Sequence, residues 1–171
     1  MAQFEKHIEK LIVKEGGYKV INVKNDRGGQ TYAGIARNFN PEWDGWDYVD
    51  SGQPVPKSAV HAYYKRNYWD ALKLDDVRSD ATAEVMFSCC VLSGTRVASR
   101  LAQSVAEVDV DGIIGKQSVT AINKIDPEVF VLRMSLARIA RFSQIVAKNK
   151  TQIKFLRGWV NRVLHEAMEI V

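Results

Sequence analysis

The sequence predicts a mainly α-helical fold with one small, irregular β or loop excursion after the first helix. Apolar residues recur at helical spacing through most of the 171-residue chain. Two glycine-rich stretches near the N-terminus interrupt this spacing, and every helix of the C-terminal half returns to it. A chain of this length buries roughly two thirds or more of its unfolded surface on folding. We therefore expect a single compact domain.

The first helix is predicted over residues 2–14, where apolar and charged side chains separate onto opposite faces. Gly16 and Gly17 end this helix, since glycine readily adopts the conformation that stops one. Residues 18–32 alternate loosely between apolar and polar side chains and contain turn residues, which is typical of a short extended excursion.

A short helix at 35–38 and a loop at 40–56 follow in the prediction. The loop contains Trp43, Trp46 and Tyr48. Exposed aromatic rings offer flat apolar faces to sugar rings, whereas buried ones cover a core, and the sequence leaves both alternatives open.

The next helices are predicted from their caps and apolar faces. Ser58 is expected to cap a helix that runs through Trp69, and Asp80 to cap the next one. Residues 85–92 are apolar at almost every position, which predicts a central helix buried on nearly all sides. This helix is expected to continue to Val105 after an irregularity at Ser93-Gly94.

The last part of the chain is predicted to hold three helices. The turn at 111–115 leads into a helix over 116–123. Asp126 and Pro127 mark the start of another, with Val129, Leu132 and Leu136 on its apolar face. The last helix spans the region of residues 156–167. We expect residues 1–92 and 93–171 to form two functional parts of one compact domain.

Composition excludes several classes of protein. The formal charge of +4 favours polyanionic surroundings, but the basic residues are scattered over helix faces, so we expect no nucleic-acid partner. No apolar run is long enough for stable membrane insertion. Cys89 and Cys90 are expected to be reduced core thiols. The three histidines lack ligand spacing and phosphate-binding loops are absent, so we expect neither metal nor cofactor.

Glu15, Asp26 and Thr31 are the candidate catalytic residues. Glu15 stands where a helix is stopped by glycines, so its backbone is fixed while its side chain can lean into a cleft as a general acid. A solvated helix-terminal carboxylate is the simpler reading of one Glu beside glycine. The glycine-rich loop that follows can bring Asp26 and Thr31 near Glu15, which favours a catalytic role.

Five stretches carry a resemblance to a known family. They are 14–18 (KEGGY), 25–35 (NDRGGQTYAGI), 64–70 (YKRNYWD), 111–118 (DGIIGKQS) and 155–163 (FLRGWVNRV). In this order they resemble the N-acetylmuramidases grouped as glycoside hydrolase family 108, which include phage endolysins and proteins labelled secretion activators. The resemblance covers nearly the whole chain.

The resemblance implies a lysozyme-like fold with a predicted peptidoglycan-binding C-terminal half. It implies hydrolysis of the β-1,4 bond between N-acetylmuramic acid and N-acetylglucosamine, with Glu15 as the catalytic acid. Such a reaction needs a second group that stabilises the oxocarbenium-like centre or positions water. Asp26 and Thr31 both suit that task, and neither the choice between them nor retention against inversion follows from the sequence.

Four aromatic side chains within these stretches are expected to bind substrate, namely Tyr18, Tyr32, Tyr68 and Trp69. The chain departs from the family at Tyr32-Ala33, where Asn-Tyr is usual, and at Ser93, where Asn is usual. A non-catalytic peptidoglycan-binding or secretion-accessory protein of the same fold is therefore the alternative function.

The expected partners are peptidoglycan glycan strands, with a holin or secretion machinery to reach them. The N-terminal residues mix charges into their apolar positions and lack the uninterrupted apolar stretch of a signal peptide. We expect synthesis in the cytoplasm and action at the cell wall or in the periplasm. The sequence does not distinguish a phage or prophage role from a bacterial one.

Overall fold

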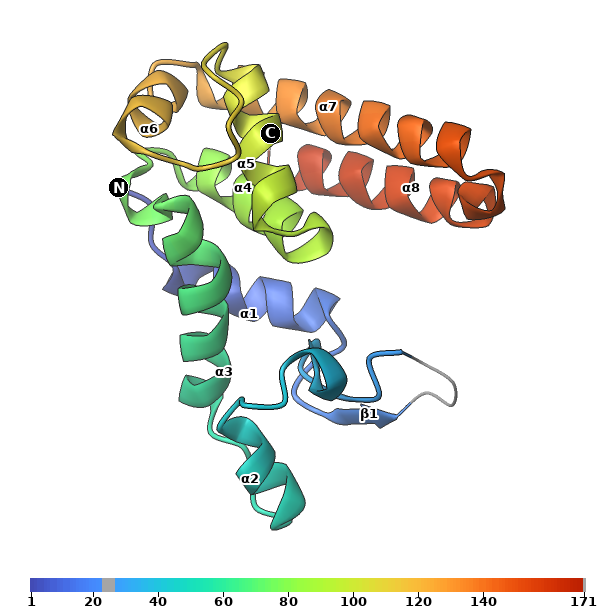
Figure 1. Cartoon of the computed structure of the whole chain (residues 1–171). Helices are drawn as coiled ribbons and strands as arrows, with labels where there is room; N and C mark the ends of the chain where they lie inside the picture. The colour runs from blue at the N-terminus through green and yellow to red at the C-terminus, as the bar shows by residue number, and fades with distance from the viewer. Residues whose placement is uncertain (23–26, 171) are drawn as a thin grey trace. The chain divides into compact units, whose positions relative to one another are not determined.

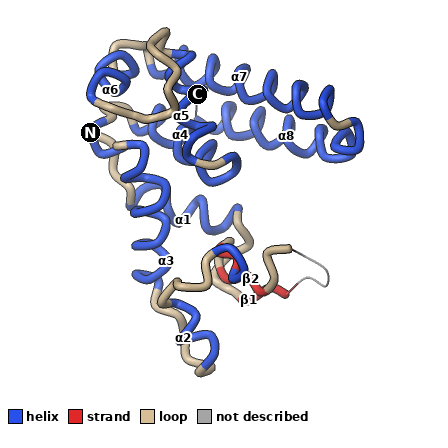
Figure 2. The backbone as a smooth tube through the Cα atoms, in the orientation of Figure 1, coloured by secondary structure: helices blue, strands red, loops and turns tan. Residues whose placement is uncertain are grey.

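The structure is a computed structural model that describes residues 1–22 and 27–170. It is mainly helical, with a small three-stranded sheet directly after the first helix (Figures 1 and 2). The predicted fold class is thereby confirmed. The chain divides into two compact units. We call residues 3–67 the N-terminal unit, and residues 1–2 together with the chain from Tyr68 onward the C-terminal unit.

The N-terminal unit combines helices with the sheet. Its elements are α1 (Glu5–Lys14), β1 (Val20–Asn22), β2 (Gln30–Tyr32), β3 (Ile35–Ala36), a 3-10 helix (Arg37–Phe39), α2 (Gly45–Asp50) and α3 (Lys57–Tyr64). β2 lies between β1 and β3 and pairs antiparallel with both. The short helix expected from residue 35 therefore begins two residues later, because Ile35 and Ala36 complete the sheet.

Aromatic rings form much of the core of the N-terminal unit. Trp43 packs edge-on against Trp46, with ring centroids 5.1 Å apart, and also contacts Tyr63 and Tyr32 at 6.2 and 6.1 Å. Trp43 is only 9% exposed and Trp46 only 3%. The two tryptophans therefore cover the core, whereas Tyr48, the third aromatic residue of their loop, is 40% exposed.

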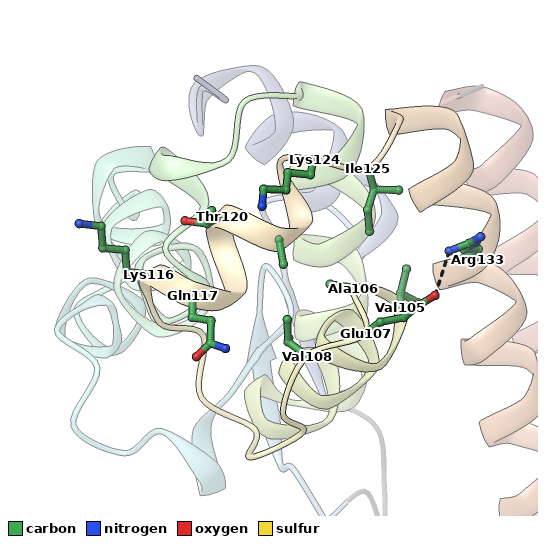
Figure 3. A pocket seen from close by; sticks show the side chains of 11 residues that line it. Val105, Ala106, Glu107, Val108, Lys116, Gln117, Thr120, Lys124, Ile125 and Arg133 are labelled. Atoms are coloured by element: carbon green, nitrogen blue, oxygen red, sulfur yellow. Dashed lines mark ion pairs between the residues drawn. The ribbon is translucent and has the colours of Figure 1, made fainter.

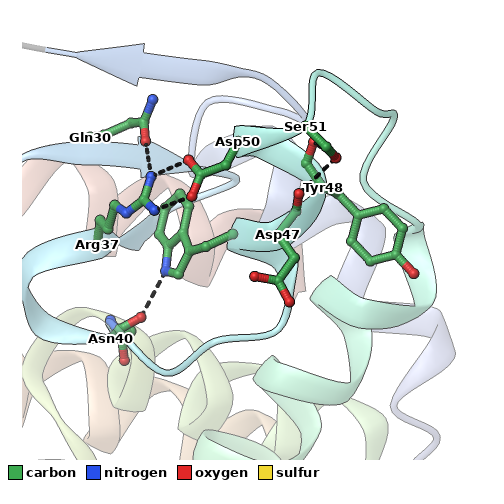
Figure 4. Close-up of polar contacts among 8 residues, drawn as sticks. Gln30, Arg37, Asn40, Asp47, Tyr48, Asp50 and Ser51 are labelled. Carbon is green, nitrogen blue, oxygen red and sulfur yellow. Dashed lines mark hydrogen bonds and ion pairs between the residues drawn. The ribbon is translucent and has the colours of Figure 1, made fainter.

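Helix α2 lies within the stretch that the sequence predicts as a loop. Its six residues have no side-chain cap, and so short a segment shows no clear helical period. The Arg37 guanidinium donates to both carboxylate oxygens of Asp50 on α2 and to Gln30 on β2 (Figure 4). The Arg37 side chain therefore links α2 to the sheet, and its hydrogen bonds lower the pKa of Asp50.

The C-terminal unit is helical throughout. Its elements are α4 (Asp80–Ser93), α5 (Thr95–Val105), α6 (Lys116–Ile122), α7 (Pro127–Lys148), α8 (Ile153–Ile170) and 3-10 helices at Asp70–Leu72, Leu74–Asp76 and Lys150–Gln152. A π-helical segment, Lys65–Trp69, connects α3 to this unit. Figure 1 shows α7 and α8 running side by side as a long hairpin, and these two helices make many contacts.

Helix α4 is the predicted central helix of this unit. Val85, Met86, Phe87, Cys89 and Cys90 are all at most 1% exposed. Both cysteines are free thiols, and burial raises the pKa of each to about 11. They are therefore largely protonated near neutral pH, as expected of core thiols.

Helix caps agree with the sequence in some places and not in others. Asp126 caps α7 as predicted, because its carboxylate accepts from the backbone of Glu128 and Val129 at 3.0 and 3.1 Å. At α4 the cap is Ser79, one residue before the expected Asp80, and its hydroxyl accepts from Thr82 at 3.3 Å. Helix α3 begins at Lys57, before the expected cap Ser58, and has no side-chain cap.

The predicted apolar face of α7 is wrong. Leu132 and Leu136 are 49% and 67% exposed, whereas Phe130 and Met134 are fully buried. The polar Arg138 lies on the buried face, where Glu166 of α8 neutralises it at 2.9 Å. Hydropathy alone predicts that an arginine is exposed. The ion pair with Glu166 instead allows Arg138 to be buried, so the buried face of α7 differs from the predicted one. Among the described residues, no helix has the length and apolar character needed to cross a bilayer.

Candidate active site

Glu15 stands at the point where α1 ends. The backbone N–H of Gly17 donates to Ile12 at 2.8 Å, and that of Gly16 donates to Val13 at 3.3 Å. These two bonds form a Schellman ending, which requires the left-handed backbone that Gly16 adopts at φ +102°. The backbone on both sides of Glu15 is therefore fixed, and its side chain is half-buried.

The turn between β2 and β3 packs directly against Glu15. Ala33 and Gly34 form this turn with φ of +48° and +80°, the positive values that a two-residue type I′ hairpin needs. A side chain at Gly34 would begin 2.9 Å from the Cβ of Glu15 and 2.5 Å from the hydroxyl of Tyr64. That hydroxyl donates to the carbonyl of Ala33 at 2.8 Å. Only glycine allows the hairpin to approach the side-chain carbons of Glu15 and the Tyr64 hydroxyl so closely.

We expect Gly34→Ala to lower the free energy of unfolding by about 2–5 kcal/mol. Left-handed strain contributes about 1–2 kcal/mol and overpacking against Tyr64 and Glu15 about 1–3 kcal/mol. Denaturant unfolding of the purified variant measures this change. Gly52→Ala is the matched control, because Gly52 also has a positive φ, of +69°, but nothing lies within 4 Å of the added carbon. Equal losses in both variants would contradict the close approach at Gly34.

Thr31 lies in the middle strand of the sheet. Its Cα pairs with Ile21 on β1 and with Ala36 on β3, and its half-buried hydroxyl donates to the carbonyl of Gly29 at 3.4 Å. Thr31 thus belongs to the hairpin whose turn packs against Glu15. Asp26, the other predicted partner of Glu15, lies outside the described residues.

Tyr18 joins a polar cluster that the sequence does not predict. Its hydroxyl donates to Glu9 on α1 at 3.0 Å and lies 2.8 Å from Nε2 of His61 on α3. The Lys57 ammonium bonds Glu9 at 3.1 Å and lies 4.7 Å from the centre of the Tyr18 ring. Burial is the main cause that raises the pKa of Tyr18, and its hydrogen bond to Glu9 is the second cause. The hydrogen bond from Lys57 lowers the pKa of Glu9. The cluster anchors the segment that follows Glu15 to two helices.

The other three predicted substrate contacts differ in exposure. Tyr32 is 9% exposed and packs on Trp43, and burial raises its pKa. Trp69 is fully buried in the C-terminal unit, where its indole donates to Asp75 at 2.7 Å and its ring meets Phe87 edge-on. A buried indole offers no face to a glycan, so Trp69 has a packing role in place of the expected contact. Tyr68 is half-buried.

The Asp111-Gly112 motif of the C-terminal unit is organised by a buried glutamine. The side-chain amide of Gln103 donates to Asp111 at 2.7 Å, and its oxygen accepts from the backbone of Gly112 at 2.8 Å. Asp111 also accepts from the backbone of Ile113 at 2.8 Å. Both hydrogen bonds lower the pKa of Asp111, and the one from Gln103 has the larger effect. The motif forms a turn, as predicted, but no pattern in the sequence indicates that Gln103 organises it.

A pocket of about 870 Å³ opens beside this turn, between the end of α5, α6 and α7 (Figure 3). Lys116, Lys124 and Arg133 line it, and Arg133 lies 3.7 Å from Glu107. None of the described residues that line it is aromatic. Within residues 1–22 and 27–170, no group of His, Cys, Asp and Glu side chains gathers as a metal site would require.

Two family models match this chain. The model described as glycosyl hydrolase 108 matches residues 8–94, slightly more than half of the chain. The chain belongs to the glycosyl hydrolase 108 family. A second model, described as a predicted peptidoglycan domain, matches residues 93–164. The family expected from the sequence is thereby confirmed, and the two matches together support a glycoside hydrolase with peptidoglycan as its partner.

Known proteins agree with this fold. The solved structure of SagA from Brucella abortus matches with a TM-score of 0.74 and 24% sequence identity, over 98% of this chain and 92% of that chain. At this identity the likeness concerns the fold alone. No curated protein matches the chain.

Proposed function

We propose that this glycosyl hydrolase 108 protein is a lysozyme-type N-acetylmuramidase. It hydrolyses the β-1,4 bond between N-acetylmuramic acid and N-acetylglucosamine in peptidoglycan. The observation that carries the proposal is the setting of Glu15. Its side chain starts at a helix end fixed by the Schellman bonds, and its aliphatic carbons lie against the glycine turn of the hairpin that holds Thr31.

In this mechanism Glu15 donates its proton to the glycosidic oxygen while the bond from that oxygen to the anomeric carbon breaks. Water then attacks the oxocarbenium-like centre, and its proton passes to a carboxylate. Thr31 and Asp26 are both candidates to assist. A threonine hydroxyl can orient the water, whereas a carboxylate can also stabilise positive charge or accept the proton of the water.

The bond that is cut tests this proposal. We expect digestion of purified peptidoglycan to release fragments whose reducing end is N-acetylmuramic acid, detected by mass spectrometry after borohydride reduction. Reducing N-acetylglucosamine would instead indicate a glucosaminidase, and free stem peptides an amidase. Intact glycan strands that still retain the protein would favour the non-catalytic peptidoglycan-binding or secretion-accessory alternative.

The proposed substrate places the site of action at the cell wall or in the periplasm. We propose that a holin or a secretion machinery gives the protein access to the wall. Cell fractionation with and without co-expression of a holin tests this step. Release of the protein and loss of wall integrity at the same rate in both cultures would contradict a requirement for the holin.

A further inference from the structure

A second pocket of the C-terminal unit differs from the first in that aromatic rings line it. It encloses about 450 Å³ between the end of α4, α7 and α8, a volume typical of ligand sites. Two aromatic and two guanidinium side chains line it, those of Phe142, Trp159, Arg141 and Arg162. We call it the Trp159 pocket. All of its lining residues belong to one compact unit.

The aromatic wall of the Trp159 pocket is built by two helices. Phe142 on α7 is 8% exposed and lies 5.3 Å from the half-buried ring of Trp159 on α8. Phe155 stacks on Trp159 from outside the pocket, with centroids 5.9 Å apart and planes 27° apart. Trp159 thus contacts both rings, and part of its surface still lines the pocket. A ring fixed in this way is suited to bind the apolar face of a sugar.

The charge of the pocket is positive. Arg141 and Arg162 line it, and no Asp or Glu among the described residues does. Glu166, which lies against Arg162 at 3.3 Å, is also bound by Arg138 at 2.9 Å, so two guanidiniums share one carboxylate. In the described part of the chain Arg141 makes no ion pair. A carboxylate that enters the pocket therefore finds an attractive charge, and arginine can bind it with two parallel hydrogen bonds.

We propose that the Trp159 pocket is a saccharide subsite for a carboxylate-bearing amino sugar of peptidoglycan. The sugar ring lies on Trp159, and the carboxylate binds Arg141. The identity of the sugar rests on the proposed function, but the pocket itself does not depend on Glu15. The carboxylate comes either from the lactyl group of N-acetylmuramic acid or from the peptide stem attached to it. A neutral N-acetylglucosamine disaccharide lacks both.

The experiment measures binding on the full chain carrying Glu15→Gln, so that hydrolysis does not interfere. The probes are a muramyl disaccharide with its peptide stem, the same disaccharide without the stem, and the N-acetylglucosamine disaccharide. We expect at least one acidic probe to bind about tenfold or more tighter than the neutral one, as a charged hydrogen bond predicts. The probe that binds identifies the source of the carboxylate. Equal binding of all three would overturn the proposal.

Variants locate the binding. In calorimetry we expect Arg141→Ala to weaken binding of the acidic probe about 10- to 100-fold, and Arg141→Lys to weaken it less, because charge is kept but the planar fork is lost. Arg157→Ala is the charge-matched control, since Arg157 is exposed on α8 outside the pocket. A loss in Arg157→Ala as large as in Arg141→Ala would contradict a specific subsite.

Tryptophan fluorescence gives a second readout. Of the four tryptophans, Trp43, Trp46 and Trp69 are at most 9% exposed, so a bound sugar should shift mainly the emission of Trp159. We expect this shift to disappear in Trp159→Phe, and its persistence would overturn the proposal. Normal hydrolysis by the unmodified protein without probe binding would reject the subsite alone. Probe binding without hydrolysis would reject the proposed function alone.

Discussion

Glu15→Gln should lower the rate of peptidoglycan hydrolysis by about 10²- to 10⁴-fold, the usual contribution of a general acid. Glutamine keeps the size of the side chain, so its contact with Gly34 is retained, but it has no proton to give to the glycosidic oxygen. We expect clearing of a peptidoglycan suspension to cease. The melting temperature should stay within a few degrees of the unmodified protein, because α1 and its Schellman ending are unchanged.

Glu5→Gln is the control for this variant. Glu5 is exposed in the first turn of the same helix, so the two variants differ in position but not in chemistry. Clearing should proceed normally in Glu5→Gln. Undiminished clearing by Glu15→Gln would show that another group is the acid. If the unmodified protein binds peptidoglycan without clearing it, the non-catalytic alternative is favoured.

The parts of the fold that follow from sequence are those set by local chemistry. Gly16 and Gly17 end α1 at Glu15, and the apolar run of α4 predicts a helix buried on nearly all sides. Asp126 caps α7 through backbone groups that lie only two and three residues later in the chain. In each case the interacting groups lie within one or two helical turns, where spacing alone indicates which side chains and backbone groups meet.

The parts that the sequence misses depend on contacts between distant residues. Glu9 and His61, whose side chains meet at Tyr18, are 52 positions apart. The buried face of α7 is set by Glu166, which follows Arg138 by 28 positions. Trp69 matches a family motif, but burial against neighbours of its own unit removes it from the candidate site. No local pattern reports such pairings, so only the three-dimensional structure shows them.

Glu166→Ala should produce the largest loss of stability among the variants considered. Glu166 is 2% exposed and accepts from Ser88 at 2.8 Å, Arg138 at 2.9 Å and Arg162 at 3.3 Å. Arg138 is equally buried, and its Nη2 has no hydrogen-bond partner within residues 1–22 and 27–170. Removal of the carboxylate leaves a buried guanidinium without compensation. We expect the free energy of unfolding to fall by about 3–5 kcal/mol in denaturant titrations.

A double variant separates buried charge from lost packing as the cause of that instability. In Arg138→Met with Glu166→Leu, apolar side chains of similar volume replace both charges, and such replacements are often neutral or stabilising. We therefore expect the double variant to recover most of the stability lost in Glu166→Ala. Glu169→Ala is the surface control, because its pair with the exposed His165 contributes about 0–1 kcal/mol. If the double variant is as unstable as Glu166→Ala, an unpaired buried charge is not the cause, because the double variant has none. The loss would then come from the missing hydrogen bond of Ser88 and from packing.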